Sequence, residues 1–210
     1  MTESKVANPA PLGLFGFGMT TILLNFVINA RLQPIDGMIF GMGIFYGGLA
    51  QIIAGILEYR KGNTFGTVAF SSYGFFWLSF VALNWLSVGS TANPVYVWPF
   101  WGGVSPWAVS SEALMAYFAM WGLFTFAMFF GTLKTNRALQ AVFATLTILF
   151  FLLAIKFGLL AYNASLNLNL FTQVTGIEGM ICGFSAFYLA AAEVLNEVHG
   201  RKVVPIGEVI

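Results

Sequence analysis

Six apolar segments, each long enough to cross a lipid bilayer, constrain the fold of this chain more than any other feature. They cover about residues 11–30, 37–58, 65–88, 112–133, 137–160 and 174–196. About 20 apolar residues span the hydrocarbon core as a helix, whereas an open sheet cannot satisfy its backbone hydrogen bonds there. The pattern therefore predicts an all-α, polytopic membrane protein with six transmembrane helices in a single membrane domain, residues 1–210.

The composition agrees with a membrane protein and argues against several other functions. Charged residues make up 8% of the chain and the net charge is +1, whereas soluble domains average roughly 25% charged residues. This balance provides no basic field for nucleic acid. The single cysteine cannot form an intrachain disulfide, and one cysteine with one histidine cannot form a metal cluster. No common catalytic motif occurs. We expect no enzyme activity, no metal, no cofactor and no nucleic-acid partner.

The distribution of lysine and arginine predicts the orientation in the membrane. Arg31 is the single basic residue in the loops of one side, because segments 89–110 and 161–173 contain none. The other side has Lys5, Arg60, Lys61, Lys134, Arg137, Arg201 and Lys202. Basic residues favour the cytoplasmic side. We therefore expect a multi-pass protein of the cell's inner (plasma) membrane with both termini in the cytoplasm.

Several charged residues near the ends of the spans have more than one interpretation. Lys156 either extends its stem to the interface or places an anion-attracting charge at the outer mouth. Glu58, Glu112 and Glu178 each pair with a base or face solvent, or they serve as a proton site inside the membrane. Glu193, close to the end of the last span, is expected at the interface.

The first two spans carry polar residues on defined faces. The first has a stripe with a spacing of four residues, Phe17, Thr21, Asn25 and Asn29. On the second, Gln51 and Glu58 are seven residues apart and share a face.

The third span has a similar stripe of Tyr73, Trp77, Phe80 and Asn84, with Ser72 beside it. Amides and carboxyls are costly in lipid, so these side chains should face the protein interior. There they form hydrogen bonds between helices or line a shared polar path. Small residues on the sixth span, such as Gly179, Gly183 and Ala186, predict close helix packing.

The chain enters its first apolar span through residues 8–14, Asn-Pro-Ala-Pro-Leu-Gly-Leu. Proline suits the first turn of a helix, and Asn8 can cap that helix from just outside. The segment therefore predicts a helix start. Its free amides and the positive end of the helix dipole also suit an anion at the mouth of a path.

These seven residues belong to a longer pattern that resembles the acetate uptake transporter family, and within it the bacterial and archaeal succinate–acetate permeases. The pattern continues through Gly-Phe-Gly-Met-Thr-Thr at 16–21, Phe-Tyr-Gly-Gly at 45–48 with Gln51, and Glu58-Tyr59 before Gly-Asn-Thr-Phe-Gly at 62–66. It also includes Ser-Tyr-Gly at 72–74, Phe-Phe-Gly-Thr-Leu-Lys at 129–134 and the tail segments 193–197 and 204–208. The resemblance covers nearly the whole chain.

The resemblance implies a ring-shaped homohexamer in which each six-helix protomer has its own path. It implies a hydrophobic constriction made of Phe17, Tyr73 and Leu146, and a small position, Ala186, associated with substrate size. The remaining residues expected along the path are Asn8, Thr21, Asn25, Asn29, Gln51, Ser72 and Asn84.

The expected function is channel-like passage of acetate and other small monocarboxylates, with succinate left open. A bare carboxylate is strongly disfavoured in an apolar neck. The path therefore stays partly wet, with Asn25, Gln51 and Ser72 donating hydrogen bonds, or the acid crosses protonated. One alternative is proton-coupled symport by alternating access with Glu58 as the proton site. Another is a membrane sensor with an occluded carboxylate site.

Overall fold

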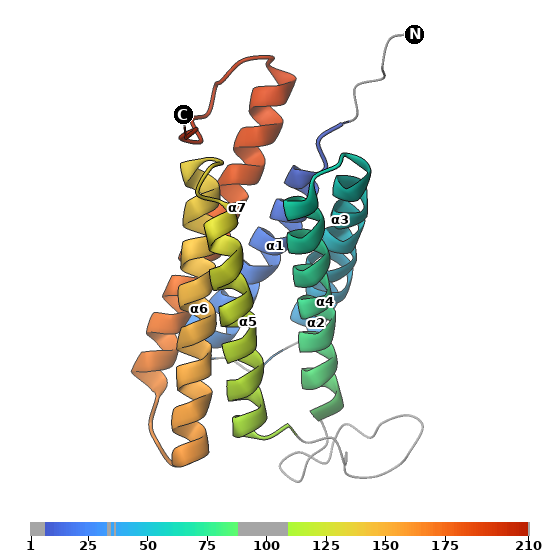
Figure 1. Cartoon of the computed structure of the whole chain (residues 1–210). Helices are drawn as coiled ribbons and strands as arrows, with labels where there is room; N and C mark the ends of the chain where they lie inside the picture. Colours follow the sequence, from blue (N-terminus) through green and yellow to red (C-terminus); the bar gives the residue numbers. More distant parts are fainter. Residues whose placement is uncertain (1–6, 33–34, 36, 88–108, 210) are drawn as a thin grey trace.

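The computed structural model describes residues 7–32, 35, 37–87 and 109–209. Lys5 and most of the loop 89–110 lie outside these residues. Within them, six helical stretches are long and apolar enough to cross a membrane, as predicted (Figure 1). The first two are composite: α1 (Ala10–Leu24) continues into the π-helix η1 (Asn25–Ala30), and α2 (Gly37–Gly41) continues through the π-helix η2 (Met42–Ala50) into α3 (Gln51–Arg60). The others are α4 (Thr64–Ser87), α5 (Ser111–Gly131), α6 (Arg137–Tyr162) and α7 (Asn169–Val198).

The sixth stretch, α7, begins at Asn169, five residues before the predicted start at 174. Its first turns contain Asn169, Thr172 and Gln173, and these polar residues lower the local hydropathy that located the span. Thr172 is buried against the rest of the bundle. Packing thus extends the helix beyond its apolar part.

Both ends of the described chain lie at the same end of the bundle, because successive helical stretches alternate in direction (Figure 1). We call this the terminal end. The turns α3–α4 and α5–α6, which carry Arg60, Lys61 and Lys134, also lie there. The predicted clustering of basic residues on one side therefore holds for these three.

Helix α1 runs through the middle of the bundle and packs against α7 on one side and η2–α3 on the other (Figure 1). A Cβ atom on Gly18 would lie 2.8 Å from the carbonyl oxygen of Gly183, and one on Gly183 would lie 2.9 Å from that of Gly18. Such a close approach of two helix backbones requires glycine at both positions. The small residues predicted to pack on the last span therefore face α1.

Aromatic side chains fill the space between α4 and the α5–α6 pair. The ring of Phe76 lies 5.2 Å from that of Trp121 on α5 and 5.1 Å from that of Phe150 on α6, both in edge-to-face geometry. Tyr73 similarly contacts Phe124, with ring centroids 5.5 Å apart. These large rings hold α4 away from α5 and α6 and enclose the space in which the cavities lie.

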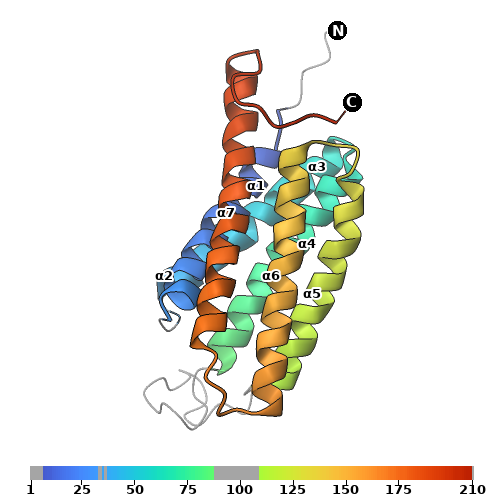
Figure 2. The same cartoon turned by 90° about the vertical axis from the view of Figure 1, so that its left-hand side faces the viewer.

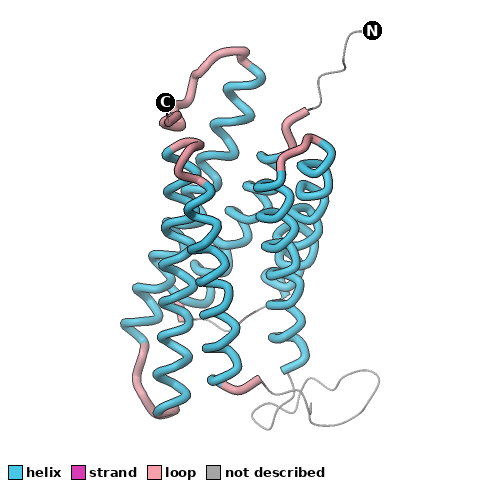
Figure 3. The backbone as a smooth tube through the Cα atoms, in the orientation of Figure 1, coloured by secondary structure: helices cyan, strands magenta, loops and turns pink. Residues whose placement is uncertain are grey.

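The C-terminal tail crosses the terminal end of α5 and α6 as a loop (Figures 2 and 3). Its carbonyls accept hydrogen bonds from the first amides of α6, Arg137 N to Gly207 O at 2.7 Å and Ala138 N to Ile206 O at 3.0 Å. Asn196 of α7 binds the tail backbone at Val204, with its Nδ2 2.8 Å from the carbonyl oxygen. The tail therefore satisfies helix-terminal donors that would otherwise need water or a side-chain cap.

Candidate substrate path

Two cavities lie in line through the bundle and share two residues, Phe17 of α1 and Leu146 of α6. The larger, of about 300 Å³, extends towards the terminal end and is lined there by Lys61 and Asn136, among others. The smaller, of about 130 Å³, extends towards the opposite end, where Lys156 and Asn84 line it. The two shared side chains therefore stand between the cavities.

The three residues expected at the constriction lie together at this boundary. Phe17 and Leu146 are 5% and 2% exposed, and the rings of Phe17 and Tyr73 lie 6.0 Å apart. Tyr73 lines the larger cavity, and its hydroxyl donates a hydrogen bond of 2.9 Å to Thr125 Oγ1. This bond satisfies the one polar atom of the Tyr73 side chain, so the boundary is apolar.

All four residues of the stripe line the smaller cavity: Phe17, Thr21, Asn25 and Asn29. Asn29 Nδ2 donates to Asn25 Oδ1 at 2.7 Å, and Asn25 Nδ2 donates to the Thr21 carbonyl at 2.9 Å. Asn25 begins the π-helix η1, a widened helical turn of the kind often found at functional sites. On the facing side, Asn84 also lines this cavity, and its Nδ2 donates to the Phe80 carbonyl at 2.8 Å.

Gln51 lies on the other side of the boundary and lines the larger cavity. Its Nε2 donates to the Gly47 carbonyl at 2.6 Å. Its buried Oε1 has no hydrogen-bond partner among the described residues. A buried acceptor of this kind is costly unless water or a solute donates to it, so Gln51 offers a contact to whatever occupies the cavity.

Five side chains form a polar cluster at the mouth of the larger cavity, which we call the mouth cluster: Asn8, Glu58, Lys61, Asn63 and Glu193. Asn8 Nδ2 donates to Glu193 Oε2, and Lys61 Nζ donates to Asn8 Oδ1, both at 2.8 Å. Fully buried Glu58 accepts from Asn63 Nδ2 at 2.6 Å and lies 3.8 Å from Lys61 Nζ. Lys61 thus lies close to Glu58 and is connected to Glu193 through Asn8.

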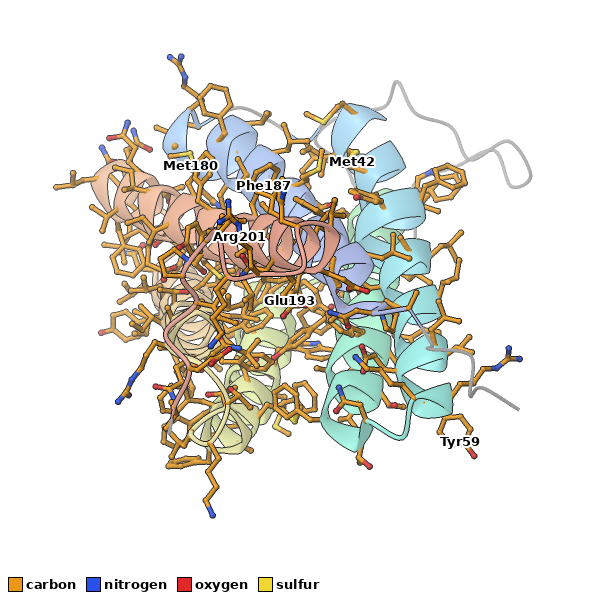
Figure 4. The ribbon with its side chains drawn as sticks, turned by 90° about the horizontal axis from the view of Figure 1, so that it is seen from above. Met42, Tyr59, Met180, Phe187, Glu193 and Arg201 are labelled. Carbon is orange, nitrogen blue, oxygen red and sulfur yellow. The ribbon has the colours of Figure 1, made fainter. Side chains whose placement is uncertain are left out.

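Sequence patterns missed three members of this cluster, Lys61, Asn63 and Glu193. Glu193, expected at the interface, lines the mouth of the larger cavity and bonds Asn8. Seen from the terminal end, Glu193 lies near the middle of the bundle, whereas Tyr59 lies at its periphery (Figure 4). Its spacing of seven residues from Ala186, on the face packed against α1, is the signal that would have placed it inside.

The remaining predicted residues are distributed as follows. Ser72 and Ala186 line neither cavity; Ala186 is fully buried beside α1, where a Cβ on Gly18 would lie 3.4 Å from its own Cβ. Glu112 is exposed in the first turn of α5. Glu178 is half-buried and lines neither cavity, whereas Lys156 lines the smaller one.

In the described part of the chain, six membrane-length helical stretches surround two cavities that meet at one apolar boundary. This is the architecture of a multi-pass membrane protein with a path for small solutes. The chain belongs to the GPR1/FUN34/yaaH family, which it matches over residues 1–206. This result confirms the family resemblance inferred from its motifs.

Named relatives include transport proteins from bacteria and yeast. The chain is 53% identical over 209 residues to the succinate-acetate/proton symporter SatP of Escherichia coli K12, covering 99% of both chains. It is 39% identical over 194 residues to ammonia transport outward protein 2 of Saccharomyces cerevisiae, covering 90% of this chain and 61% of the yeast protein. Its fold matches the structure of the bacterial acetate channel SatP with a TM-score of 0.80 and 52% identity, covering 97% of this chain and 100% of that one.

Proposed function

We propose that this protein passes acetate and other small monocarboxylates across the membrane by a channel-like path through each protomer. The observation that carries the proposal is the pair of in-line cavities that share Phe17 and Leu146. The names of its bacterial relatives, an acetate channel and a succinate-acetate symporter, support acetate as the substrate. These relatives are named as transport proteins and not as enzymes.

The proposed path has a hydrophobic constriction with hydrogen-bonding amides on both sides. Phe17, Tyr73 and Leu146 limit the size of the solute, and an apolar neck of this kind can close by dewetting. Gln51 on one side and Asn25 on the other contact the carboxylate before and after it crosses. This arrangement shortens the stretch over which the carboxylate lacks polar partners and so limits its desolvation cost.

The proposed setting is the inner (plasma) membrane of the cell, with the terminal end in the cytoplasm. The basic residues Arg60, Lys61 and Lys134 at that end support this orientation. The proposed assembly is a homohexamer. Large apolar side chains on the outside of the bundle, such as Phe45, Phe184 and Leu123, provide surface for lipid and for neighbouring protomers. Mass measurement in mild detergent tests the hexamer, and a monomer under all conditions would contradict it.

Transport by the purified protein is the direct test. Liposomes containing the protein are expected to take up labelled acetate faster than protein-free liposomes, which correct for diffusion of neutral acetic acid. Acetate uptake indistinguishable from that of empty liposomes, at every pH and gradient tried, would refute the proposed function.

Proton-coupled symport is the second candidate. It is favoured by the full burial of Glu58 beside the larger cavity, with its Oε1 lacking a hydrogen-bond partner among the described residues. Voltage separates the two mechanisms. A potassium diffusion potential, inside positive, accelerates acetate uptake if a channel conducts the anion, and it leaves an electroneutral symporter unaffected. Acceleration by a pH gradient alone would favour symport.

A further inference from the structure

We propose that Lys156 of α6 supplies the positive charge of a carboxylate-binding site in the smaller cavity, on the side of the constriction away from the termini. The inference rests on the proposed function and adds a binding residue to its path. Lys156 lines this cavity together with Asn25, Asn29 and Asn84. One lysine and three asparagines therefore border the same cavity.

The Lys156 ammonium has no counter-ion among the residues that the structure describes, since no ion pair joins it to a carboxylate within 4.0 Å. Its Nζ lies 5.6 Å from the centroid of the Phe157 ring, and this ring also lines the cavity. Glu112 and Glu178 do not line it. Cations inside membrane proteins are rare, usually paired, and mark the paths of ions or substrates. A bound carboxylate would provide the missing negative charge.

The amides complete the site for the two oxygens of a carboxylate. Each amide nitrogen has two N–H donors. In Asn29 one of them bonds Asn25, and in Asn84 one bonds the Phe80 carbonyl. Each residue therefore retains a second donor for a carboxylate oxygen, so that the ligand receives directed hydrogen bonds as well as charge.

The size and apolar walls of the cavity favour a small acid. Its volume of about 130 Å³ is less than half that of the larger cavity, about 300 Å³. Leu24, Leu149 and Phe118 are among its apolar lining residues, which suits a short aliphatic chain. The chemical class of the ligand is thus a short-chain monocarboxylate.

The mouth cluster provides a contrast on the other side of the constriction. There Lys61 already bonds Asn8 and lies near Glu58, and Glu193 adds a second carboxyl group. An anion entering the larger cavity meets excess negative charge, whereas in the smaller cavity it meets an unpaired cation. The anion should therefore bind more tightly in the smaller cavity.

The test compares the concentration dependence of acetate uptake for three variants in liposomes. Lys156→Gln is expected to raise the half-saturation concentration about tenfold, as loss of one close charge pair predicts. Lys156→Arg should stay close to wild type. Lys134→Gln, an exposed lysine in the α5–α6 turn that lines neither cavity, should also match wild type. A wild-type half-saturation concentration in Lys156→Gln would overturn the inference.

Competition on the wild-type protein gives a second measurement that does not depend on a variant folding. Formate should compete with acetate, whereas uncharged acetamide of similar shape should not. Equal competition by the two would overturn the inference. Failure of the wild-type protein to take up acetate at all would instead refute the proposed function.

Asp36→Asn tests the alternative that Lys156 serves only as the partner of an acidic side chain. Asp36 follows Ile35, which lines the smaller cavity, and lies outside the described residues. A wild-type half-saturation concentration in Asp36→Asn supports the proposed carboxylate site. A tenfold rise of the half-saturation concentration in both Lys156→Gln and Asp36→Asn, with the wild-type value restored in the double variant, would overturn the inference.

Discussion

Asn8 and Glu193, 185 residues apart in the sequence, are joined by a hydrogen bond of 2.8 Å from Asn8 Nδ2 to Glu193 Oε2. The bond connects the start of α1 to α7 across the mouth of the larger cavity. Asn8 Oδ1 accepts from Lys61 Nζ at 2.8 Å and from the Ala10 amide at 3.3 Å. The N-cap of α1 is Pro9, without a side-chain cap bond, so Asn8 contacts the first amide of α1 from outside the helix while it also bonds a lysine and a glutamate.

Asn8→Ala is predicted to destabilise the protein by about 1–3 kcal/mol, because it leaves partly buried charged groups without a hydrogen-bond partner. Acetate uptake should fall as well, since the mouth cluster loses its central member. Thermal unfolding in detergent and liposome uptake measure the two effects. Asn163→Ala, at an exposed loop position, is the matched control. Wild-type values for Asn8→Ala in both measurements would show that the bonds contribute nothing.

Phe17→Ala and Leu146→Ala are predicted to widen the constriction and admit larger monocarboxylates, such as butyrate. Each removes a side chain that both cavities share. Each also leaves a void, which typically lowers stability by about 2–5 kcal/mol. Uptake of a series of acids of increasing chain length measures the change. Phe45→Ala, which truncates an exposed ring, should keep the wild-type limit, and an unchanged limit in both constriction variants would refute their assignment.

Ala186→Leu is predicted to reduce or block acetate uptake through a change in helix packing. Ala186 lines neither cavity and is fully buried between α7 and α1 beside Gly18. Overpacking at such a position typically lowers stability by about 1–3 kcal/mol and should displace α1, which carries Phe17. Ala141→Leu, exposed on α6, is the control. Wild-type uptake by Ala186→Leu would remove this position from the determinants of transport.

Glu58→Gln is predicted to leave acetate uptake driven by its own gradient within about threefold of wild type, because Gln keeps the shape and the contact with Asn63. The exchange removes the buried charge near Lys61, so thermal unfolding should be measured alongside. Should uptake driven by a pH gradient disappear in this variant while the protein stays folded, Glu58 would be the proton site of a symporter.

Local sequence patterns were sufficient wherever neighbouring residues on one helix make up the feature. The stripe from Phe17 to Asn29 lines one cavity because a spacing of four residues returns each side chain to nearly the same helix face. The sequence patterns did not predict the π-helix that begins at Asn25. Asn25 and Asn29 still line the same cavity as Phe17 and Thr21. The extension of α7 to Asn169 was missed because its first turns are polar and tertiary packing stabilises them.

By itself, the sequence determined that six apolar helices cross a membrane and that their polar faces turn inward, because lipid offers no partner for an amide or a carboxyl. Only the tertiary structure decided that Glu193 meets Asn8, that Lys61 bonds Asn8, and that Lys156 lines a cavity. Those pairings depend on the rotation and height of each helix against its neighbours. The close contact of Gly18 with Gly183 and the aromatic layer around Phe76 set these positions, and no local spacing records them.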